Sequence, residues 1–396
     1  MPFSKYKKIN IFFTIVCAIS IFDLAIFFYL PLLSEIRQEF RVSESLVQLS
    51  ASINLLGIGI SSMVYGILSD AWGRRKLVLF GIFTFSVASH CISHINSINA
   101  LFIFRFIQGI GAGVAWSIGN AILHDIYKGK AFEKGIIILT TIIGIMMIIS
   151  PTLGGYIGTI IGWRQGFNLM AISGLILFIY SIFSLPETSQ NTRYRVDISK
   201  IAHNYKTLLT NYAYIRYLII KVFMVAVAFT NIITLPLIFI EKYHTSTEYC
   251  GILMAFGSLV FVIGSFISNE LVNYISTKNI IKYSLLLIFF SSITIIIIER
   301  FGSFTAISIQ LIKIPYLLGI AGIFGNATHK IVGAVPTLPS SASAMMITLE
   351  MLTSSLAVKL VSSFYNQTLY PLEIFTLVVC TVSYIMLKGL YYEFHN

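Results

Sequence analysis

The chain has 396 residues, of which 57% are hydrophobic and 11% are charged, and its mean hydropathy is +0.86. This composition is too apolar for a soluble domain of this length and indicates a membrane protein. The formal net charge of +11 would suit a nucleic-acid partner, but its position between apolar segments fits membrane orientation better, so we expect no nucleic acid to bind.

Apolar runs of about 20 residues, the length that crosses a bilayer as a helix, recur along the whole chain. The first run contains Asp23, is too long for a signal-peptide core and is followed by no small-residue cleavage site, so we expect it to remain as the first span. The sequence predicts an all-α polytopic membrane protein with twelve transmembrane helices, at 9–33, 46–68, 77–95, 99–123, 136–160, 166–185, 217–240, 249–271, 281–298, 303–327, 340–365 and 369–390.

The Lys and Arg residues between the predicted spans lie mostly on one face of the membrane if the N-terminus is placed inside. Cytoplasmic loops of membrane proteins carry such an excess of positive charge. We therefore expect both termini, and the long connection 186–216, to be cytoplasmic.

A cluster of charge separates the second and third spans in "YGILSDAWGRRKLVLFG", Tyr65 to Gly81. In the simplest interpretation Arg74 and Arg75 only orient the protein. Asp70 needs another explanation, because acidic residues contribute little to orientation; its carboxylate can pair with an Arg or face the N-terminal end of another helix. Gly73 permits the tight reversal that starts the third span.

Two ionisable side chains lie deep inside spans of the N-terminal half, and such groups usually mark a pathway or a partner. Asp23 of the first span and Arg105 of the fourth lie at similar depth, so we predict that they pair. A changing separation between them would change the proton affinity of the carboxylate, and we nominate both for proton coupling. A structural tie between helices is the alternative for Arg105. Phe27, Tyr29 and Gln108 are candidates for a substrate pocket.

The fifth span carries small and helix-breaking residues in "SPTLGGYIGTIIGWRQGF", Ser150 to Phe167. We expect Pro151 to kink this helix, and Gly154 and Gly155 to let a neighbouring helix approach closely. The alternative is that these are ordinary Gly and Pro residues of a membrane helix.

The longest connection, 186–216, is polar and basic and divides the chain near its midpoint into segments 1–185 and 217–396. Two features of the first half recur in the second at nearly the same offset. They are "YLPLL" from Tyr29 with "TLPLI" from Thr234, and the set Asp70, Gly73 and Arg75 with the weaker set Asn273, Ser276 and Lys278. This pattern predicts two pseudo-symmetric six-helix bundles joined by a linker, an arrangement typical of secondary transporters.

The C-terminal half has its own ionisable residues inside spans. Lys313 and Glu350 lie at similar depth in the tenth and eleventh spans, and both a structural ion pair and a substrate or proton role are open to them. We nominate Glu350 for proton coupling, and Lys313 and Asn326 for the substrate pocket. Lys221 and Lys359 lie nearer the span ends and are expected to reach toward the membrane surface.

The sequence offers no clear cofactor, nucleotide or metal site. It lacks the P-loop pattern G-x-x-x-x-G-K-[ST], so an ion gradient is the expected energy source. The four cysteines are scattered without metal-ligand spacing. His90 and His94 have the i, i+4 spacing of metal ligands, but a bare pair near a membrane surface is a weak indication. We therefore expect no cofactor and no bound metal.

The cluster between the second and third spans resembles the loop signature G-x-L-x-D-x-x-G-R-[RK] of the major facilitator superfamily, where it serves in gating; the matches are Gly66, Leu68, Asp70, Gly73, Arg74 and Arg75. "RFIQGIGAG", from Arg105, is similar to the fourth-span pattern R-x-x-Q-G-x-G. The fifth span resembles the antiporter pattern G-P-x-x-G-G followed by W-R-x-x-F, at Ser150, Pro151, Gly154 and Gly155. With "YLP" at Tyr29, "VQLS" at Val47 and "SSASAMM" at Ser340, these motifs resemble the bicyclomycin-resistance (Bcr/CflA) branch of drug/proton antiporters.

The resemblance covers nearly the whole chain and implies the fold of that superfamily in a bacterial inner membrane. It implies multidrug efflux: small amphiphilic compounds leave in exchange for protons, by alternating access, through a single subunit. It also implies that Asp70 helps to close the cytoplasmic side in one state. The sequence departs from the branch at Ser150, where Gly or Ala is usual, and at Phe28, where an acid often precedes the Tyr, so the resemblance leaves the coupling acid open.

Two alternatives remain from the sequence. One is a proton-coupled importer or exporter of a metabolite or siderophore-like compound on the same scaffold. The other is a polytopic receptor or membrane enzyme, although the sequence carries no catalytic cluster or sensory domain to support it.

Overall fold

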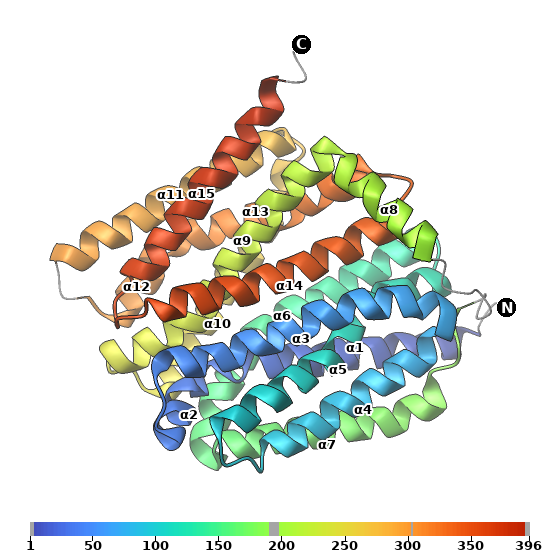
Figure 1. Cartoon of the computed structure of the whole chain (residues 1–396), viewed down its shortest axis with the longest axis horizontal. Helices are drawn as coiled ribbons and strands as arrows, with labels where there is room; N and C mark the ends of the chain where they lie inside the picture. Colours follow the sequence, from blue (N-terminus) through green and yellow to red (C-terminus); the bar gives the residue numbers. More distant parts are fainter. Residues whose placement is uncertain (1–3, 190–197, 302–303, 393–396) are drawn as a thin grey trace. The chain divides into compact units, whose positions relative to one another are not determined.

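The computed structural model describes residues 4–189, 198–301 and 304–392, and within these residues all regular structure is helical (Figure 1). The chain divides into two compact units, Met1–Asp197 and Ile198–Asn396. Their boundary falls inside the predicted linker 186–216, of which residues 190–197 lie outside the described part. Each unit is a bundle of long helices.

In the N-terminal unit, α3 packs against α5, α5 against α4, and α4 against α7, while α1 contacts α6 and α7. The first apolar segment does not end with α1 but continues through η1 and α2 to Phe40. The elements are α1 (Lys5–Phe27), η1 (Leu30–Leu32), α2 (Leu33–Phe40), α3 (Glu44–Trp72), α4 (Arg74–Ile92), α5 (Ile98–Ile126), α6 (Lys130–Ile161) and α7 (Trp163–Ser184).

Glycines allow the closest helix contacts in this unit. A Cβ at Gly109 of α5 would collide with the carbonyl oxygen of Asn54 on α3, and a Cβ at Gly57 of α3 with the carbonyl oxygen of Phe106 on α5. The two backbones therefore touch, as small residues permit in membrane helices. This contact holds α3 beside the turn of α5 that carries Arg105.

In the C-terminal unit, α9 packs against α13, α14 and α15, so it is surrounded by other helices. Helix α13 also contacts α10 and α11. The elements are α8 (Ile198–Thr210), α9 (Tyr212–Leu237), η2 (Ile238–Lys242), α10 (Thr247–Leu271), α11 (Thr277–Phe301), α12 (Ala306–Ile312), α13 (Ile314–Ala334), α14 (Pro339–Ser363) and α15 (Tyr370–Tyr392).

Among the described residues, 11 helices are long and apolar enough to cross a membrane, and α12 with α13 makes up to 12 if this bent pair is one span. The predicted all-α membrane fold is thus confirmed. The predicted tenth span, 303–327, is bent, because α12 and α13 meet at an angle of 46°.

Proline explains the break in the tenth span. Pro315 lies in the first turn of α13, and its ring cannot be accommodated against the carbonyl four residues earlier in a continuous helix. Helix α12 therefore ends at Ile312, and the Ile312 carbonyl accepts a hydrogen bond of 3.1 Å from the hydroxyl of Ser291 on α11. The residue left at the break is Lys313.

Lys313 is fully enclosed, with 1% of its side chain exposed. Its Nζ lies 2.6 Å from Glu373 Oε1 on α15 and donates to Asn231 Oδ1 on α9, also at 2.6 Å. The Tyr316 ring centroid is 4.7 Å from the same nitrogen. The alternative of a Lys313–Glu350 ion pair is therefore wrong, and Lys313 ties three elements together inside the bundle.

We expect Lys313→Met to lower the free energy of unfolding by about 3–5 kcal/mol, because it leaves the Glu373 carboxylate buried without its cation. The double variant Lys313→Met/Glu373→Gln should recover most of that loss, since no unpaired charge remains. Unfolding of the purified protein in detergent measures both. Equal stability of the single variant and the wild type would show that the pair contributes nothing.

Candidate functional site

Arg105 is the largest buried cation of the N-terminal unit, with 1% exposure. Its Cζ lies 4.4 Å from the ring centroid of Tyr29 and 5.8 Å from that of Phe167 on α7. Nη1 donates to Gln108 Oε1 at 2.7 Å and to the Ala25 carbonyl at 3.4 Å. Aromatic faces and neutral oxygens therefore hold the guanidinium, an arrangement that suits its planar, delocalised charge.

Other helices fix the groups around Arg105. Gln108 Nε2 donates to Ser89 Oγ on α4 at 2.8 Å, and Asn54 Nδ2 on α3 donates to the Arg105 carbonyl at 3.0 Å. The Tyr29 hydroxyl hydrogen-bonds Ser50 on α3. The sequence predicted no role for two of the residues around Arg105, Ser50 and Phe167 on α7. Each of them is the last residue of a motif, "VQLS" for Ser50 and "WRQGF" for Phe167. That position in a motif could have identified them.

Asp23 lies on α1, two residues before the carbonyl that Arg105 contacts, and only 1% of it is exposed. Among the described residues neither carboxylate oxygen of Asp23 has a hydrogen-bond partner. The predicted Asp23–Arg105 pair is therefore wrong for this structure, because Gln108, the Ala25 carbonyl and the two rings already surround the guanidinium. A buried carboxylate without partners is costly when charged. It is accordingly well placed to take up a proton or a cationic ligand.

Phe27 and Tyr29 were predicted to line an apolar pocket. Phe27 ends α1 and is buried, and Tyr29 is buried completely against Arg105. Tyr29 therefore belongs to the packed surroundings of the Arg105 side chain.

The charged motif between α3 and α4 is held together by an acid for which the sequence predicted no role. Glu187, which follows α7, accepts hydrogen bonds from the backbone N–H groups of Arg74 at 2.9 Å and Arg75 at 3.2 Å. A carboxylate at a helix N-terminus is favourable. The same carboxylate occupies the space that a side chain at residue 73 would need, and Gly73 has a φ of +86°. Gly73 is therefore required for the reversal and for this contact.

The two arginines of the motif have further partners. Arg74 pairs with Asp125 near the end of α5, and Arg75 donates to the Ile182 carbonyl of α7 at 2.7 Å. Gly66 and Asp70 lie in the last two turns of α3, and the Asp70 side chain is outside the described part of the structure. The turn between α3 and α4 is thus tied to α5 and α7 within its own unit.

The antiporter motif brings α6 against the stretch that carries Tyr29. Ser150, Pro151, Gly154 and Gly155 are buried, and a Cβ at Gly154 would collide with the carbonyl oxygen of Phe28. The close approach predicted for this segment is present. Helix α6 runs from Lys130 to Ile161 without interruption at the proline.

The C-terminal unit contains a second buried ion pair. Lys221, on α9, has 2% of its side chain exposed, and its Nζ lies 3.6 Å from Glu350 Oε1 on α14. The same nitrogen donates to the Phe324 carbonyl on α13 at 2.7 Å. The prediction that Lys221 reaches the membrane surface is wrong, because α9 is enclosed by neighbouring helices. The Lys359 side chain is exposed.

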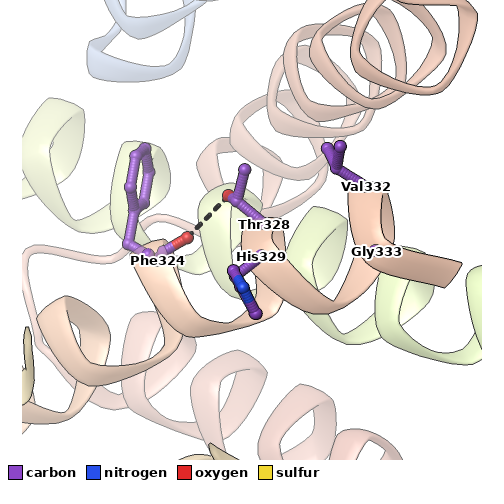
Figure 2. A pocket seen from close by; sticks show the side chains of 6 residues that line it. Phe324, Thr328, His329, Val332 and Gly333 are labelled. Atoms are coloured by element: carbon purple, nitrogen blue, oxygen red, sulfur yellow. Dashed lines mark hydrogen bonds between the residues drawn. The ribbon is translucent and has the colours of Figure 1, made fainter. Parts of the chain in front are cut away.

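One face of α13 borders an open pocket of about 530 Å³ (Figure 2). In Figure 2 the Phe324 and Val332 side chains project from the same side of the helix. Asn326 does not line this pocket, since it donates to Ser268 Oγ on α10 at 2.6 Å and is buried. The lining residues are Phe324, Gly325, Thr328, His329, Val332 and Gly333.

Metal binding finds no support in the described part of the chain, where no three His, Cys, Asp or Glu side chains come together. His90 Nδ1 lies 3.2 Å from Asn168 Oδ1, and His94 Nδ1 lies 3.0 Å from the His90 carbonyl. The Nδ1 atom of each histidine therefore lies beside a polar group of a nearby residue.

Comparison with known proteins identifies the family. A profile of the Major Facilitator Superfamily matches residues 15–388. The uncharacterized MFS-type transporter YdgK of Bacillus subtilis is 28% identical over 65% of this chain and 65% of its own length. The bicyclomycin resistance protein homolog of Haemophilus influenzae is 22% identical over 89% of each chain, and the multidrug resistance protein MdtL of Klebsiella pneumoniae is 24% identical over 83% of this chain and 82% of its own.

Solved structures show the same fold at low sequence identity. The D-xylose–proton symporter has a TM-score of 0.77 and 12% identity, and the match covers 95% of this chain and 97% of that chain. A POT family transporter in complex with 5-aminolevulinic acid has a TM-score of 0.78 and 13% identity, with 98% and 95% covered. Because the family profile spans most of the sequence and the fold agrees, the chain belongs to the Major Facilitator Superfamily of multi-pass membrane transporters and is not an enzyme.

Proposed function

We propose that the protein is a proton-coupled exporter of small amphiphilic compounds in a bacterial inner membrane, from the bicyclomycin-resistance branch of its superfamily. Its motifs in the first, fourth and fifth spans resemble that branch, and two of its relatives are named for bicyclomycin or multidrug resistance. It exchanges its cargo for protons by alternating access between an N-terminal bundle, 1–185, and a C-terminal bundle, 217–396, as a monomer. The alternative cargo is a metabolite or siderophore-like compound, moved in either direction.

The observation that carries proton coupling is the Asp23 carboxylate, which is buried within a span and has no hydrogen-bond partner among the described residues. A proton neutralises such a group at the lowest cost, because charged carboxylates are strongly disfavoured away from water. Arg105 on the neighbouring α5 is already held by neutral groups, so it keeps its place whether Asp23 is charged or neutral. Proton uptake at Asp23 then changes the charge of the site without breaking an ion pair.

We expect Asp23→Asn to abolish uphill efflux driven by a pH gradient and to retain binding of neutral substrates, because the variant keeps the shape of the side chain but cannot release a proton. Arg105→Ala should damage both, since it removes the group that Tyr29, Phe167 and Gln108 surround. Purified protein in liposomes, loaded with a fluorescent substrate, measures transport in each direction.

Glu350 is the rival acid for proton coupling, so Glu350→Gln is measured in the same assay. Uphill efflux that survives in Asp23→Asn and fails in Glu350→Gln would move coupling to the C-terminal half.

Asp70 is proposed to latch one state of the transport cycle. Replacing it with Asn removes a charge-assisted hydrogen bond in that state alone, which shifts a two-state equilibrium by about tenfold. We expect Asp70→Asn to reach normal expression and normal thermal stability while its transport rate falls. Wild-type rates in well-folded Asp70→Asn would remove the latch from the mechanism.

The proposed orientation places both termini and the 186–216 segment in the cytoplasm, because most Lys and Arg residues between spans lie on that face. A cysteine introduced at Ser189 should resist a membrane-impermeant thiol reagent in intact cells and react after permeabilisation. The background is a variant in which the four native cysteines are replaced. Labelling from outside intact cells would contradict the orientation.

A further inference from the structure

The two buried ion pairs of the C-terminal unit differ in how tightly they are closed. In the Lys313–Glu373 pair the charged atoms lie 2.6 Å apart, and Asn231 holds the same ammonium. In the Lys221–Glu350 pair the separation is 3.6 Å, and the Phe324 carbonyl holds the ammonium. Within the described residues each pair leaves one carboxylate oxygen without a hydrogen bond, Glu373 Oε2 and Glu350 Oε1, so the separation is what distinguishes them. A charge-assisted hydrogen bond is usually about 2.7–2.9 Å long. The first pair is a closed structural contact, whereas the second is buried but loosely joined.

Phe324 connects the loose pair to the open pocket on α13. Its ring centroid lies 3.4 Å from Lys221 Nζ, and its carbonyl accepts a 2.7 Å hydrogen bond from the same atom. Its side chain is also part of the pocket lining and is 40% exposed (Figure 2). One partly exposed aromatic side chain therefore lies between the buried cation and the open pocket.

The pocket itself suits an apolar or aromatic body. Only Thr328 and His329 bring polar side chains to its lining. Thr328 donates to the Phe324 carbonyl at 2.8 Å, so its hydroxyl is engaged by the helix. A Cβ at Gly325 or Gly333 would meet no atom within 4 Å, which leaves open space along this face of α13.

We propose that the Lys221–Glu350 pair and this pocket form a recognition site for zwitterionic amphiphiles. The ligand carboxylate binds the Lys221 ammonium, the ligand ammonium binds the Glu350 carboxylate, and the apolar body fills the pocket after the Phe324 ring turns aside. The inference rests on the proposed function, because it names the substrate class of that exporter.

Charge balance explains why a zwitterion is preferred. A ligand with a single charge that opens the pair would satisfy one buried ion and leave the other without a partner, which is strongly unfavourable in a low-dielectric bundle. A ligand with both charges replaces each partner that it displaces. The loose pair therefore discriminates against simple anions and simple cations of the same size.

Three fluorescent probes test this on the wild-type protein in nanodiscs, without any gradient. Nε-dansyl-lysine carries an amine and a carboxylate, dansylcadaverine lacks the carboxylate, and N-dansyl-6-aminohexanoic acid lacks the amine. We expect dansyl-lysine to bind about tenfold more tightly than either relative, the difference expected for one charged contact. Titrations against empty nanodiscs remove the contribution of lipid partitioning. Equal affinities for the three probes, or binding of none, would overturn the proposal.

Variants of Lys221 and Glu350 test which of the two charges produces each preference among the probes. Lys221→Met should erase the preference for dansyl-lysine over dansylcadaverine, and Glu350→Gln the preference for dansyl-lysine over the aminohexanoic acid derivative. The double variant Lys221→Met/Glu350→Gln leaves no unpaired charge and guards against failure to fold. Lys359→Met, which removes an exposed lysine from the same helix as Glu350, is the matched control and should keep wild-type preferences.

A purely structural ion pair predicts another pattern, in which Lys221→Met weakens all three probes by the same factor; that result overturns the proposal. If neither single variant folds, loss of all discrimination in the double variant supports the site, and retained discrimination overturns it. Because binding is measured without a pH gradient, failure of proton-coupled export leaves this result unchanged. Conversely, absent discrimination beside intact uphill efflux would reject the zwitterion site alone.

Discussion

Charge buried in an apolar bundle constrains both units of this transporter, because neither lipid nor packed side chains can solvate an ion as water does. Arg105, Lys313 and Lys221 each have hydrogen-bond partners in their own unit, and those contacts join the helices around them. Asp23 differs, since the described residues give its carboxylate no hydrogen-bond donor. A site for a transported proton needs a carboxylate without a permanent partner, because a carboxylate that is already paired gains little free energy from binding a proton.

The two units satisfy their buried cations by different chemistry. In the N-terminal unit, aromatic rings, an amide and a backbone carbonyl hold Arg105, so its charge does not depend on the protonation of an acid. In the C-terminal unit both buried lysines face carboxylates. In one pair the charged atoms lie 2.6 Å apart and Asn231 also binds the lysine, whereas in the other they lie 3.6 Å apart and the Phe324 carbonyl also binds the lysine. We propose the first unit for proton exchange and the second for recognition of a charged ligand.

The charged turn between α3 and α4 also pairs its charged groups, here at the N-terminal end of α4. Glu187 binds the first N–H groups of α4 and fills the space left by Gly73, while Asp125 pairs with Arg74. The turn is therefore joined to α5 and to the segment after α7. A conformational change that moves this turn has to move those contacts together.

The sequence by itself determined the fold class, the positions of nearly all spans and the superfamily, because span length, apolar composition and short motifs are local properties of the chain. It also identified Asp23, Arg105, Lys313 and Glu350 as ionisable residues inside the predicted spans. Only the tertiary structure decided the partners. Glu187 lies 113 residues from Arg74 and Glu373 lies 60 residues from Lys313. Depth follows from counting residues along a helix, but a partner depends on which face each helix turns toward its neighbours, and packing of the whole bundle sets that rotation.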